Sequence, residues 1–488
     1  MNLRYPTNKH VIALILLVFI SIILFSNTFR NSFIWDDEHL IVDNRYIKGL
    51  KHIPFLFTTQ YWNHHHPGMK GQYRPVRTVT FALDYYLWKS NPFGYHLSNL
   101  LLHILNVILI YFLIYRLVGI SKSEEGLAGR NLDWFKLLNP AFLTALFFAA
   151  HPIHTESVTW IKNRSDLLSL LFFLLSFLLF IRYRLRKEIK TRILSYSLAL
   201  FCFILALFSK EMALSLPLVL VLYALCFLPK KEYSKTITKI LPFLAVAILY
   251  FVFKLTTLGM LISAENIPKI GLYSNILVVL KTIGYYLKLL ILPVNLNAER
   301  LLSIPKSFLE PAILSSAISL SLLLIIIIKT FKYAKIVTFA ILWIFLTLLP
   351  ASNILFLSGR PIAEQRLYIP SLGFCLLLGM GISKLLSLEL KSNIFRNLTA
   401  LFSIFILTFY STTLIKRNLD WRNSLSLWSK TAQASPDSVR AYNNLGLAYY
   451  AFNKNEEAIA LFKKAIEINP DYADVYSNLA LAYCAINK

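Results

Sequence analysis

A run of ionisable residues, Trp35-Asp36-Asp37-Glu38-His39, follows shortly after the first apolar segment, Val11–Phe25. Acidic residues are scarce, with 25 Asp and Glu against 50 Lys and Arg, so three consecutive acids indicate a functional site more than a solvated surface. A carboxylate that faces a partly dry pocket can remove the proton of an acceptor hydroxyl. We predict that Asp36 and Asp37 form such a catalytic site. The structural alternative is a helix N-cap, a position that Asp favours.

Cations that suit a phosphate occur at the mouths of other apolar segments. Arg74 and Arg77 lie in Tyr73-Arg74-Pro75-Val76-Arg77, and guanidinium groups bind phosphate through bidentate hydrogen bonds. The alternative for these arginines is snorkelling toward lipid head groups. Lys210, followed by Glu211, is a second candidate phosphate ligand, with a salt-bridged hinge as its structural alternative.

The connector from His151 to Asp166 holds two histidines, two acids and two cations beside an apolar segment. Ionisable groups at membrane depth are costly and usually functional. We predict that Glu156 faces Asp36 and that Lys162 and Arg164 neutralise a phosphate. His-x-x-His followed by Glu is a weak metal signal, and the three consecutive histidines 64–66 lack a second ligand group, so no metal site is predicted.

The last cluster, Ala363-Glu364-Gln365-Arg366, stands at the start of another apolar segment. Arg366 is the strongest sequence candidate for a phosphate ligand, because we place it at a helix N-terminus whose dipole favours anions. We assign four further residues to acceptor binding or to support of the carboxylates: His39, His154, Glu156 and Glu364.

The elements that position these residues are membrane-spanning helices. The chain has 488 residues and a mean hydropathy of +0.58. Hydrophobic residues make up 57% of it, above the apolar content of about 45–50% in soluble domains. About 20 apolar residues span a bilayer. We predict an all-α polytopic membrane protein with eleven spans: Val11–Phe29, His96–Tyr115, Leu137–Ala150, Asp166–Arg182, Ile193–Phe208, Ala213–Leu228, Ile240–Leu258, Ala312–Ile328, Ile336–Leu357, Leu367–Leu386 and Leu398–Ile415.

Charge sets the orientation of these spans. Basic short loops stay on the cytoplasmic side, and all of them do so here if the apolar run Ile276–Leu292 is re-entrant or interfacial. The long first loop, residues 30–95, and the C-terminus then lie outside. The net charge of +25 resides in these loops, so we predict no nucleic-acid partner. The four cysteines have no disulfide spacing.

A 34-residue period at the end of the chain predicts tetratricopeptide repeats (TPRs). A half-repeat, one full repeat and a partial repeat are expected, and further repeats are expected to follow Lys488 because such repeats need neighbours for stability. We therefore divide the chain into a membrane domain, 1–416, and a TPR domain, 417–488. The matching pairs are Leu445/Leu479, Ala448/Ala482, Tyr449/Tyr483 and Pro436/Pro470.

Taken in order, these motifs resemble one family, the transmembrane-plus-tetratricopeptide O-mannosyltransferases and their bacterial relatives, which are integral-membrane glycosyltransferases of the GT-C class. The family pattern is an Asp-Glu pair with a His two residues on, and Asp36, Asp37 and His39 fall on these positions, with Asp in place of Glu at 37. The motifs that carry the resemblance are Trp35-Asp36-Asp37, Tyr73-Arg74-Pro75, Tyr95–His103, His151–Glu156, Lys210-Glu211 and Glu364–Ser371.

The resemblance implies a GT-C-like bundle, an odd number of spans and a non-cytoplasmic active site, on the periplasmic face of a bacterial inner membrane or in the lumen of the endoplasmic reticulum. It implies a polyprenyl-phosphate sugar as donor substrate, no certain cofactor, and Asp36 as the base. We expect inverting transfer of a hexose such as mannose to a hydroxyl, with Arg366, Arg74, Lys210 or Arg164 on the leaving phosphate and an acceptor protein or glycan on the TPRs. The alternatives are a non-catalytic membrane-anchored TPR scaffold and a polyisoprenoid-lipid transporter.

Overall fold

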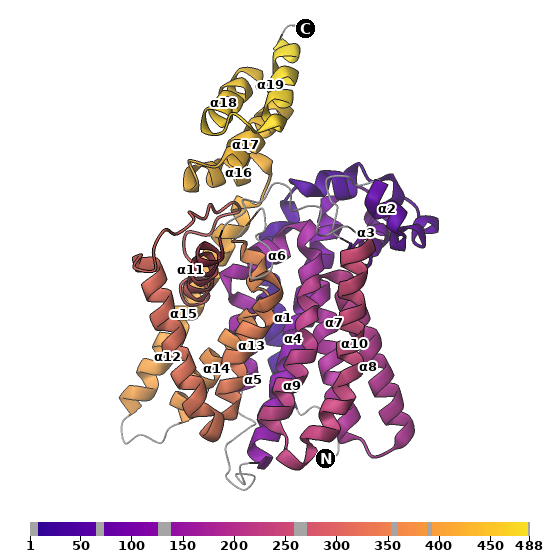
Figure 1. Cartoon of the computed structure of the whole chain (residues 1–488), viewed down its shortest axis with the longest axis vertical. Helices are drawn as coiled ribbons and strands as arrows, with labels where there is room; N and C mark the ends of the chain where they lie inside the picture. The colour runs from indigo at the N-terminus through magenta and orange to yellow at the C-terminus, as the bar shows by residue number, and fades with distance from the viewer. Residues whose placement is uncertain are drawn as a thin grey trace.

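The computed structural model describes residues 8–64, 73–124, 138–257, 271–352, 360, 362–387 and 393–486. Regular secondary structure in these ranges is helical, and one isolated antiparallel bridge joins Arg300 to Ile362. Helices of the bundle run roughly parallel to its long axis, and the C-terminal helices extend from one end of it (Figure 1). The prediction of an all-α chain is confirmed.

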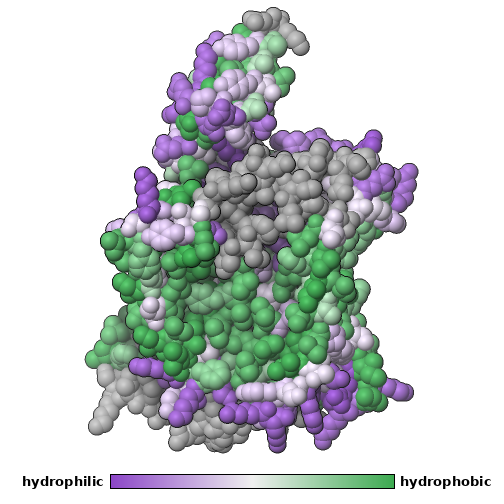
Figure 2. All heavy atoms as spheres, in the orientation of Figure 1, coloured by the Kyte–Doolittle hydropathy of each residue, from purple (hydrophilic) through white to green (hydrophobic). Residues whose placement is uncertain are grey.

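Each predicted span corresponds to a helix. Among the described residues, eight helices are long and apolar enough to cross a membrane and four shorter helices are also apolar. Apolar side chains cover the middle of the bundle surface (Figure 2). This composition is that of an integral membrane protein. The helices that match the predicted spans are α1 (Asn8–Phe25), α4 (Pro92–Glu124), α5 (Pro140–Ala150), α7 (Arg164–Leu185), α8 (Ile189–Ser209), α9 (Leu216–Phe227), α10 (Tyr233–Thr257), α12 (Pro311–Tyr333), α13 (Lys335–Leu348), α14 (Ser371–Ser387) and α15 (Asn393–Asp420).

The additional apolar run forms one continuous helix, α11 (Leu272–Ile291). Its length and composition are sufficient for a span. In Figure 1, however, α11 is seen nearly end-on, across the direction of α12 and α13. This orientation favours the interfacial placement, which stays a prediction.

Short helices at one end of the bundle carry the polar motifs. The first loop folds into α2 (Thr59–His64), α3 (Pro75–Trp88) and several single turns. The connector between α5 and α7 forms the turn Pro152–His154, α6 (Thr155–Thr159) and the turn Ile161–Asn163. Because α7 starts directly after this connector and is 22 residues long, its basic end at Arg182 to Arg186 lies about 30 Å away.

Four helices follow α15 and form the TPR segment: α16 (Ser424–Ala434), α17 (Val439–Ala451), α18 (Asn455–Ile468) and α19 (Ala473–Ile486). They correspond to the second helix of one repeat, a full repeat and the first helix of the next, as the period predicts. Gly446 of α17 packs on Phe462 of α18, where an added Cβ would lie 2.5 Å from the ring. This close approach explains the glycine.

The TPR segment is fixed to the first loop by tryptophans. Trp35 stacks on Trp160 with ring centroids 4.4 Å apart, and its ring meets Trp428 of α16 edge-on at 4.7 Å. Trp160 in turn stacks on Trp421 at 5.6 Å. Trp35 has a left-handed backbone conformation with φ of 54°, which is strained for a bulky residue and is held by this packing. The motif Trp35-Asp36-Asp37 therefore contacts the repeats directly.

Replacing Trp428 by Ala is expected to loosen this contact. The side chain is 2% exposed, and deleting a buried Trp typically costs about 3–5 kcal/mol. We expect backbone amides of Ile34 to Asp43 to exchange hydrogen about 10-fold faster or more, measured by mass spectrometry. Phe462→Ala, which opens an equally buried cavity between α17 and α18, is the control and should leave exchange in the first loop unchanged. Unchanged exchange in both variants would refute the coupling.

Candidate functional site

Asp36 lies at the end of the bundle beside the TPR segment, with 23% of its side chain exposed. Its Oδ2 forms an ion pair with Lys162 Nζ, and this ammonium also lies 4.6 Å from the centre of the Trp160 ring. The partial exposure leaves the carboxylate accessible to an incoming hydroxyl. Asp36 thus combines a fixed position with access, as a general base requires.

Asp37 is buried and serves as an anchor. Its Oδ1 accepts a hydrogen bond from the Lys162 backbone N at 2.8 Å, and its Oδ2 accepts one from the Ile34 N at 3.2 Å. Both oxygens are therefore occupied by backbone amides, which tie the first loop to the turn before α7. The predicted pair divides into an accessible Asp36 and a structural Asp37.

The environment of Asp37 predicts a pH dependence of stability. Burial raises the pKa of Asp37 from 3.8 to about 8, so the folded chain retains a proton that the unfolded chain loses. The contribution of Asp37 is therefore fully present below about pH 4 and is lost as the pH rises to about 8. We expect Asp37→Asn to show a shallower fall in melting temperature between pH 5 and 8 than the parent. The exposed Asp43→Asn is the control, and identical slopes for Asp37→Asn and the parent would contradict the assignment.

Further cations surround Asp36. Arg74 pairs with Glu211 at 2.8 Å, and Lys254 approaches the same carboxylate at 3.3 Å. Lys210 donates to both oxygens of Asp166, at 2.7 and 2.8 Å. We call these residues, together with Asp36, Lys162 and Arg77, the Asp36 cluster, because electrostatic interactions link Arg77 and Lys162 to Arg74 and Asp36.

The Asp36 cluster carries an excess of positive charge. Its described members are five cations (Arg74, Arg77, Lys162, Lys210 and Lys254) and three carboxylates (Asp36, Asp166 and Glu211). Two positive charges therefore remain without a carboxylate at a site that reaches solvent through Asp36 and Glu211, whose side chains are 23% and 25% exposed. Such a site suits an anionic ligand.

Arg164 does not face this cluster as a free ligand. Its guanidinium is buried and pairs with Asp84 at 2.6 Å. Nε donates to Asn99 Oδ1 at 2.7 Å and Nη2 donates to the Tyr95 carbonyl at 3.0 Å. These contacts join α3, α4 and α7 and leave Arg164 a packing role.

Glu156 and Glu364 belong to a second group, which we call the glutamate cluster. Glu156 has a different cationic partner from Asp36, which pairs with Lys162. Glu156 pairs with Arg360 at 3.0 Å, and Glu364 pairs with Arg417 at 3.3 Å. Glu299 completes the cluster through Arg440 of α17 at 3.0 Å and Arg360 at 3.7 Å. Because each carboxylate has an arginine, this cluster is balanced and connects the membrane bundle to the repeats.

Arg366 and His39 are two further predicted site residues. Arg366 lies in the turn Glu364–Leu367, before α14 begins at Ser371, so it is not in the first turn of that helix. The backbone of its neighbour Gln365 donates to Glu156 at 3.3 Å, so the turn that holds Arg366 adjoins the glutamate cluster, and Lys162 is the cation that pairs with Asp36. His39 is exposed and approaches Asp43 at 3.6 Å.

His154 has a structural environment. Its Nε2 hydrogen-bonds Ser371 Oγ at 2.7 Å, and its ring packs on Phe148 and Tyr368. Burial, with His151 and His103 nearby, holds the pKa of His154 well below its usual range. The ring is therefore neutral and orients the start of α14.

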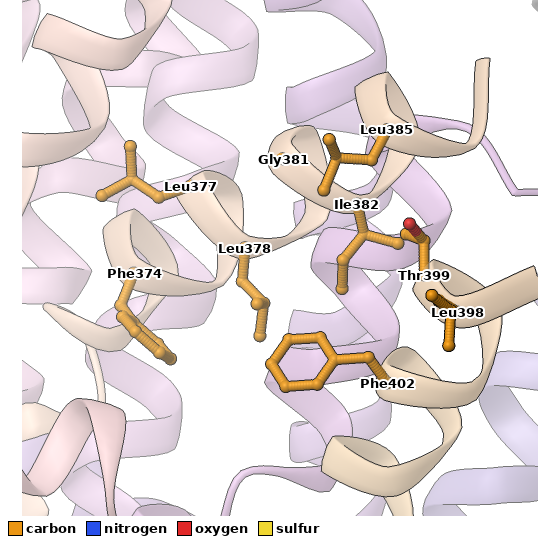
Figure 3. A pocket seen from close by; sticks show the side chains of 9 residues that line it. All are labelled: Phe374, Leu377, Leu378, Gly381, Ile382, Leu385, Leu398, Thr399 and Phe402. Carbon is orange, nitrogen blue, oxygen red and sulfur yellow. The ribbon is translucent and has the colours of Figure 1, made fainter. Parts of the chain in front are cut away.

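An apolar groove of about 410 Å³ lies between α14 and α15 (Figure 3). Phe374 and Leu378 of α14 face Phe402 of α15, and Leu385 and Leu398 lie toward the helix ends remote from Asp36. Thr399 is its one polar lining side chain in the described chain, and its hydroxyl bonds to the Phe395 carbonyl. The groove can hold an acyl or prenyl chain but offers no group for a phosphate.

Sequence reasoning missed part of the Asp36 cluster. Lys254 lies near the end of a predicted span, and Asp166 begins another, so ionisable residues at membrane depth were the available signal. Arg360 carries no motif and was missed. In the described ranges no three His, Cys, Asp or Glu side chains gather as a metal centre would require.

Comparisons with known proteins agree with the resemblance. A TPR repeat model matches residues 448–486. Over 89% of its length the chain is 28% identical to protein O-mannosyl-transferase F38B6.6 of Caenorhabditis elegans, covering 59% of that protein. It is 28% identical to Drosophila melanogaster Tmtc3 over 90% of the chain and 53% of the relative. It is 26% identical to human protein O-mannosyl-transferase TMTC3 over 86% of the chain and 47% of the relative.

The chain thus spans about half the length of these curated relatives. No solved structure matches it. The similarity to protein O-mannosyl-transferases with TPRs, expected from the motifs, is confirmed.

Proposed function

We propose that this chain, like the protein O-mannosyl-transferases to which it is similar, is an integral-membrane glycosyltransferase. It transfers a hexose, mannose by the names of its relatives, from a polyprenyl-phosphate sugar to a hydroxyl of an acceptor, such as Ser or Thr of a protein. The observation that carries the proposal is the position of an accessible carboxylate, Asp36, within a cluster of excess positive charge.

The proposed reaction proceeds with inversion. Asp36 accepts the proton of the acceptor hydroxyl as its oxygen forms a bond to the anomeric carbon. The bond from that carbon to the phosphate oxygen breaks, and the electron pair leaves with the polyprenyl phosphate. Positive charges of the Asp36 cluster stabilise the charge that develops on the phosphate, which is usually the largest catalytic contribution.

Arg74 and Lys162 replace Arg366 and Arg164 as the candidate phosphate ligands. Both lie in the cluster that contains Asp36, whereas Arg164 is enclosed by its partners on α3 and α4 and Arg366 lies in a turn that adjoins the glutamate cluster. Lys210 is a less direct candidate, because its partner Asp166 is buried, whereas the carboxylate partners of Lys162 and Arg74 are partly exposed.

The site is proposed to face the extracytoplasmic side. The last turn of α7 holds Arg182 and Arg184, and Arg186 and Lys187 follow it, at the end of the helix opposite Asp166. Basic short loops stay in the cytoplasm, which supports a position of Asp36 and the TPR segment in the periplasm of a bacterium or the lumen of the endoplasmic reticulum. The repeats, packed on Trp35, would hold the acceptor beside Asp36.

The charge distribution disfavours the two alternatives. A polyisoprenoid-lipid transporter needs polar groups along a path through the bilayer, whereas the charged residues of α7 are confined to its two ends. A scaffold without catalysis has no use for unbalanced cations around an accessible carboxylate. The apolar groove could accept a prenyl chain under any of the three readings.

The proposal is tested by incubating the purified chain with polyprenyl-phosphate [³H]mannose and acceptor proteins in extracytoplasmic extract. Label in protein, removed by β-elimination, supports O-linked transfer. GDP-[³H]mannose is the control donor and should give no label. Binding of the lipid donor without transfer to any acceptor would contradict the proposed activity and favour a transporter.

A further inference from the structure

Arg77 is a buried cation without a hydrogen-bond acceptor. Its relative exposure is 0%, and Nε, Nη1 and Nη2 all lack a partner among the described residues. Burial and the nearby Arg74 lower its pKa to about 9, so the guanidinium is still charged at pH 7. A buried charge is strongly unfavourable unless it is paired, so an unpaired one calls for a ligand.

Comparison with other buried arginines shows that Arg77 differs from them. Arg164 pairs with Asp84, and Arg417 pairs with Glu364 and Asp420. Within the Asp36 cluster, Arg74, Lys162, Lys210 and Lys254 each have a carboxylate partner in the described chain. Among the described members of the cluster, Arg77 is therefore the cation that has no ion pair with a carboxylate.

The position of Arg77 adds to its attraction for anions. It lies in the first turn of α3, a helix of 14 residues that starts at Pro75, where the helix dipole is positive. Asp36, Arg74 and Glu211 are its charged neighbours, and Lys162 is close enough to interact with it electrostatically. Asp36 and Glu211 are partly exposed, so the cluster reaches solvent at these two side chains.

We infer that Arg77 binds the phosphate group of the lipid-linked donor, with its planar guanidinium on two phosphate oxygens. This inference rests on the proposed function and deepens it. The phosphodiester of the donor carries one negative charge, and the phosphomonoester product carries up to two. The charge of Arg77 therefore favours the leaving group more than the donor, as catalysis requires.

The test measures lipid binding by the purified full chain in detergent, independently of sugar transfer. Three probes are used: undecaprenyl phosphate, its uncharged alcohol undecaprenol, and inorganic phosphate. We expect Arg77→Met to weaken undecaprenyl phosphate binding about 10- to 100-fold, as loss of a charge-assisted bidentate contact predicts, and to leave undecaprenol binding unchanged. The affinity of Arg77→Lys for undecaprenyl phosphate should lie between those of the parent and Arg77→Met. Arg45→Met, at an exposed arginine of the same loop, is the matched control.

Thermal unfolding without lipid provides the second readout. Because Met removes an unpaired buried charge, Arg77→Met should unfold at the same temperature as the parent or higher. A lower melting temperature would show that Arg77 has a structural partner and would overturn the inference, as would unchanged affinity for undecaprenyl phosphate. An Arg77-dependent affinity for inorganic phosphate equal to that for the lipid would support the phosphate site and assign it to free phosphate.

The two proposals fail differently. If the parent binds undecaprenyl phosphate through Arg77 but transfers no sugar, the glycosyltransferase proposal fails and the phosphate site stands. If sugar is transferred and Arg77→Met binds the lipid with the parent affinity, the phosphate site at Arg77 fails and the glycosyltransferase proposal stands.

Discussion

Asp36→Asn is expected to lower the rate of mannose transfer about 100- to 10,000-fold, the usual contribution of general-base catalysis. Asn preserves the size of the side chain but cannot accept the hydroxyl proton. The carboxylate is the accessible member of its pair, with 23% of its side chain exposed, whereas both oxygens of Asp37 are held by backbone amides. Initial rates with excess polyprenyl-phosphate mannose measure the effect.

Two controls separate chemistry from folding in this experiment. Asp43→Asn changes an exposed acid outside the Asp36 cluster and should retain the parent rate. Asp36→Asn leaves Lys162 without its carboxylate partner, so lipid binding and melting temperature are measured alongside. A folded variant that binds undecaprenyl phosphate and transfers mannose at the parent rate would exclude Asp36 as the base.

The helices were predictable because bilayer thickness and apolar composition constrain them directly. The run Arg164–Leu185 has two charged residues near each end of an apolar stretch, and the helix ends where this pattern predicts. The TPR period likewise predicted the positions of α16 to α19, since Gly446 of α17 and Phe462 of α18 keep the spacing that lets these two helices pack. Local sequence determines such elements.

The partners within the site were not predictable, because they come from distant parts of the chain. Lys162 and Arg164 are two residues apart and equivalent by composition, yet Lys162 pairs with Asp36 and Arg164 with Asp84. Lys162 lies in the turn Ile161–Asn163 and Arg164 begins α7, so they point to different neighbours. For the same reason nothing in the sequence distinguished the accessible Asp36 from the buried Asp37.

Two clusters of similar composition thus acquire different roles. In the glutamate cluster every carboxylate has an arginine partner, and Arg440 extends the network into the repeats. In the Asp36 cluster positive charge is in excess, and Arg77, which lies over the Phe81 ring at 5.8 Å, has no hydrogen-bond partner in the described chain. The first arrangement stabilises the junction of the two domains, whereas the second retains charge for a ligand. Trp35, which lies under Arg360 at 5.4 Å and precedes Asp36, joins the two clusters.

Arg164→Met should be the most destabilising substitution in this region, by about 3–5 kcal/mol, because it leaves Asp84 buried and unpaired. We expect little folded protein in detergent, measured by size-exclusion chromatography and thermal unfolding. Arg164→Met combined with Asp84→Leu removes both charges and should recover most of the stability.

The double variant decides between packing and phosphate binding for Arg164. If Arg164 joins α3, α4 and α7, as its contacts to Asp84, Asn99 and Tyr95 indicate, the stable double variant transfers mannose at close to the parent rate. If it holds the donor phosphate, as sequence alone suggested, the double variant folds but loses affinity for undecaprenyl phosphate. The Asp36 cluster is untouched in both variants, so a loss of affinity would have to come from Arg164 itself.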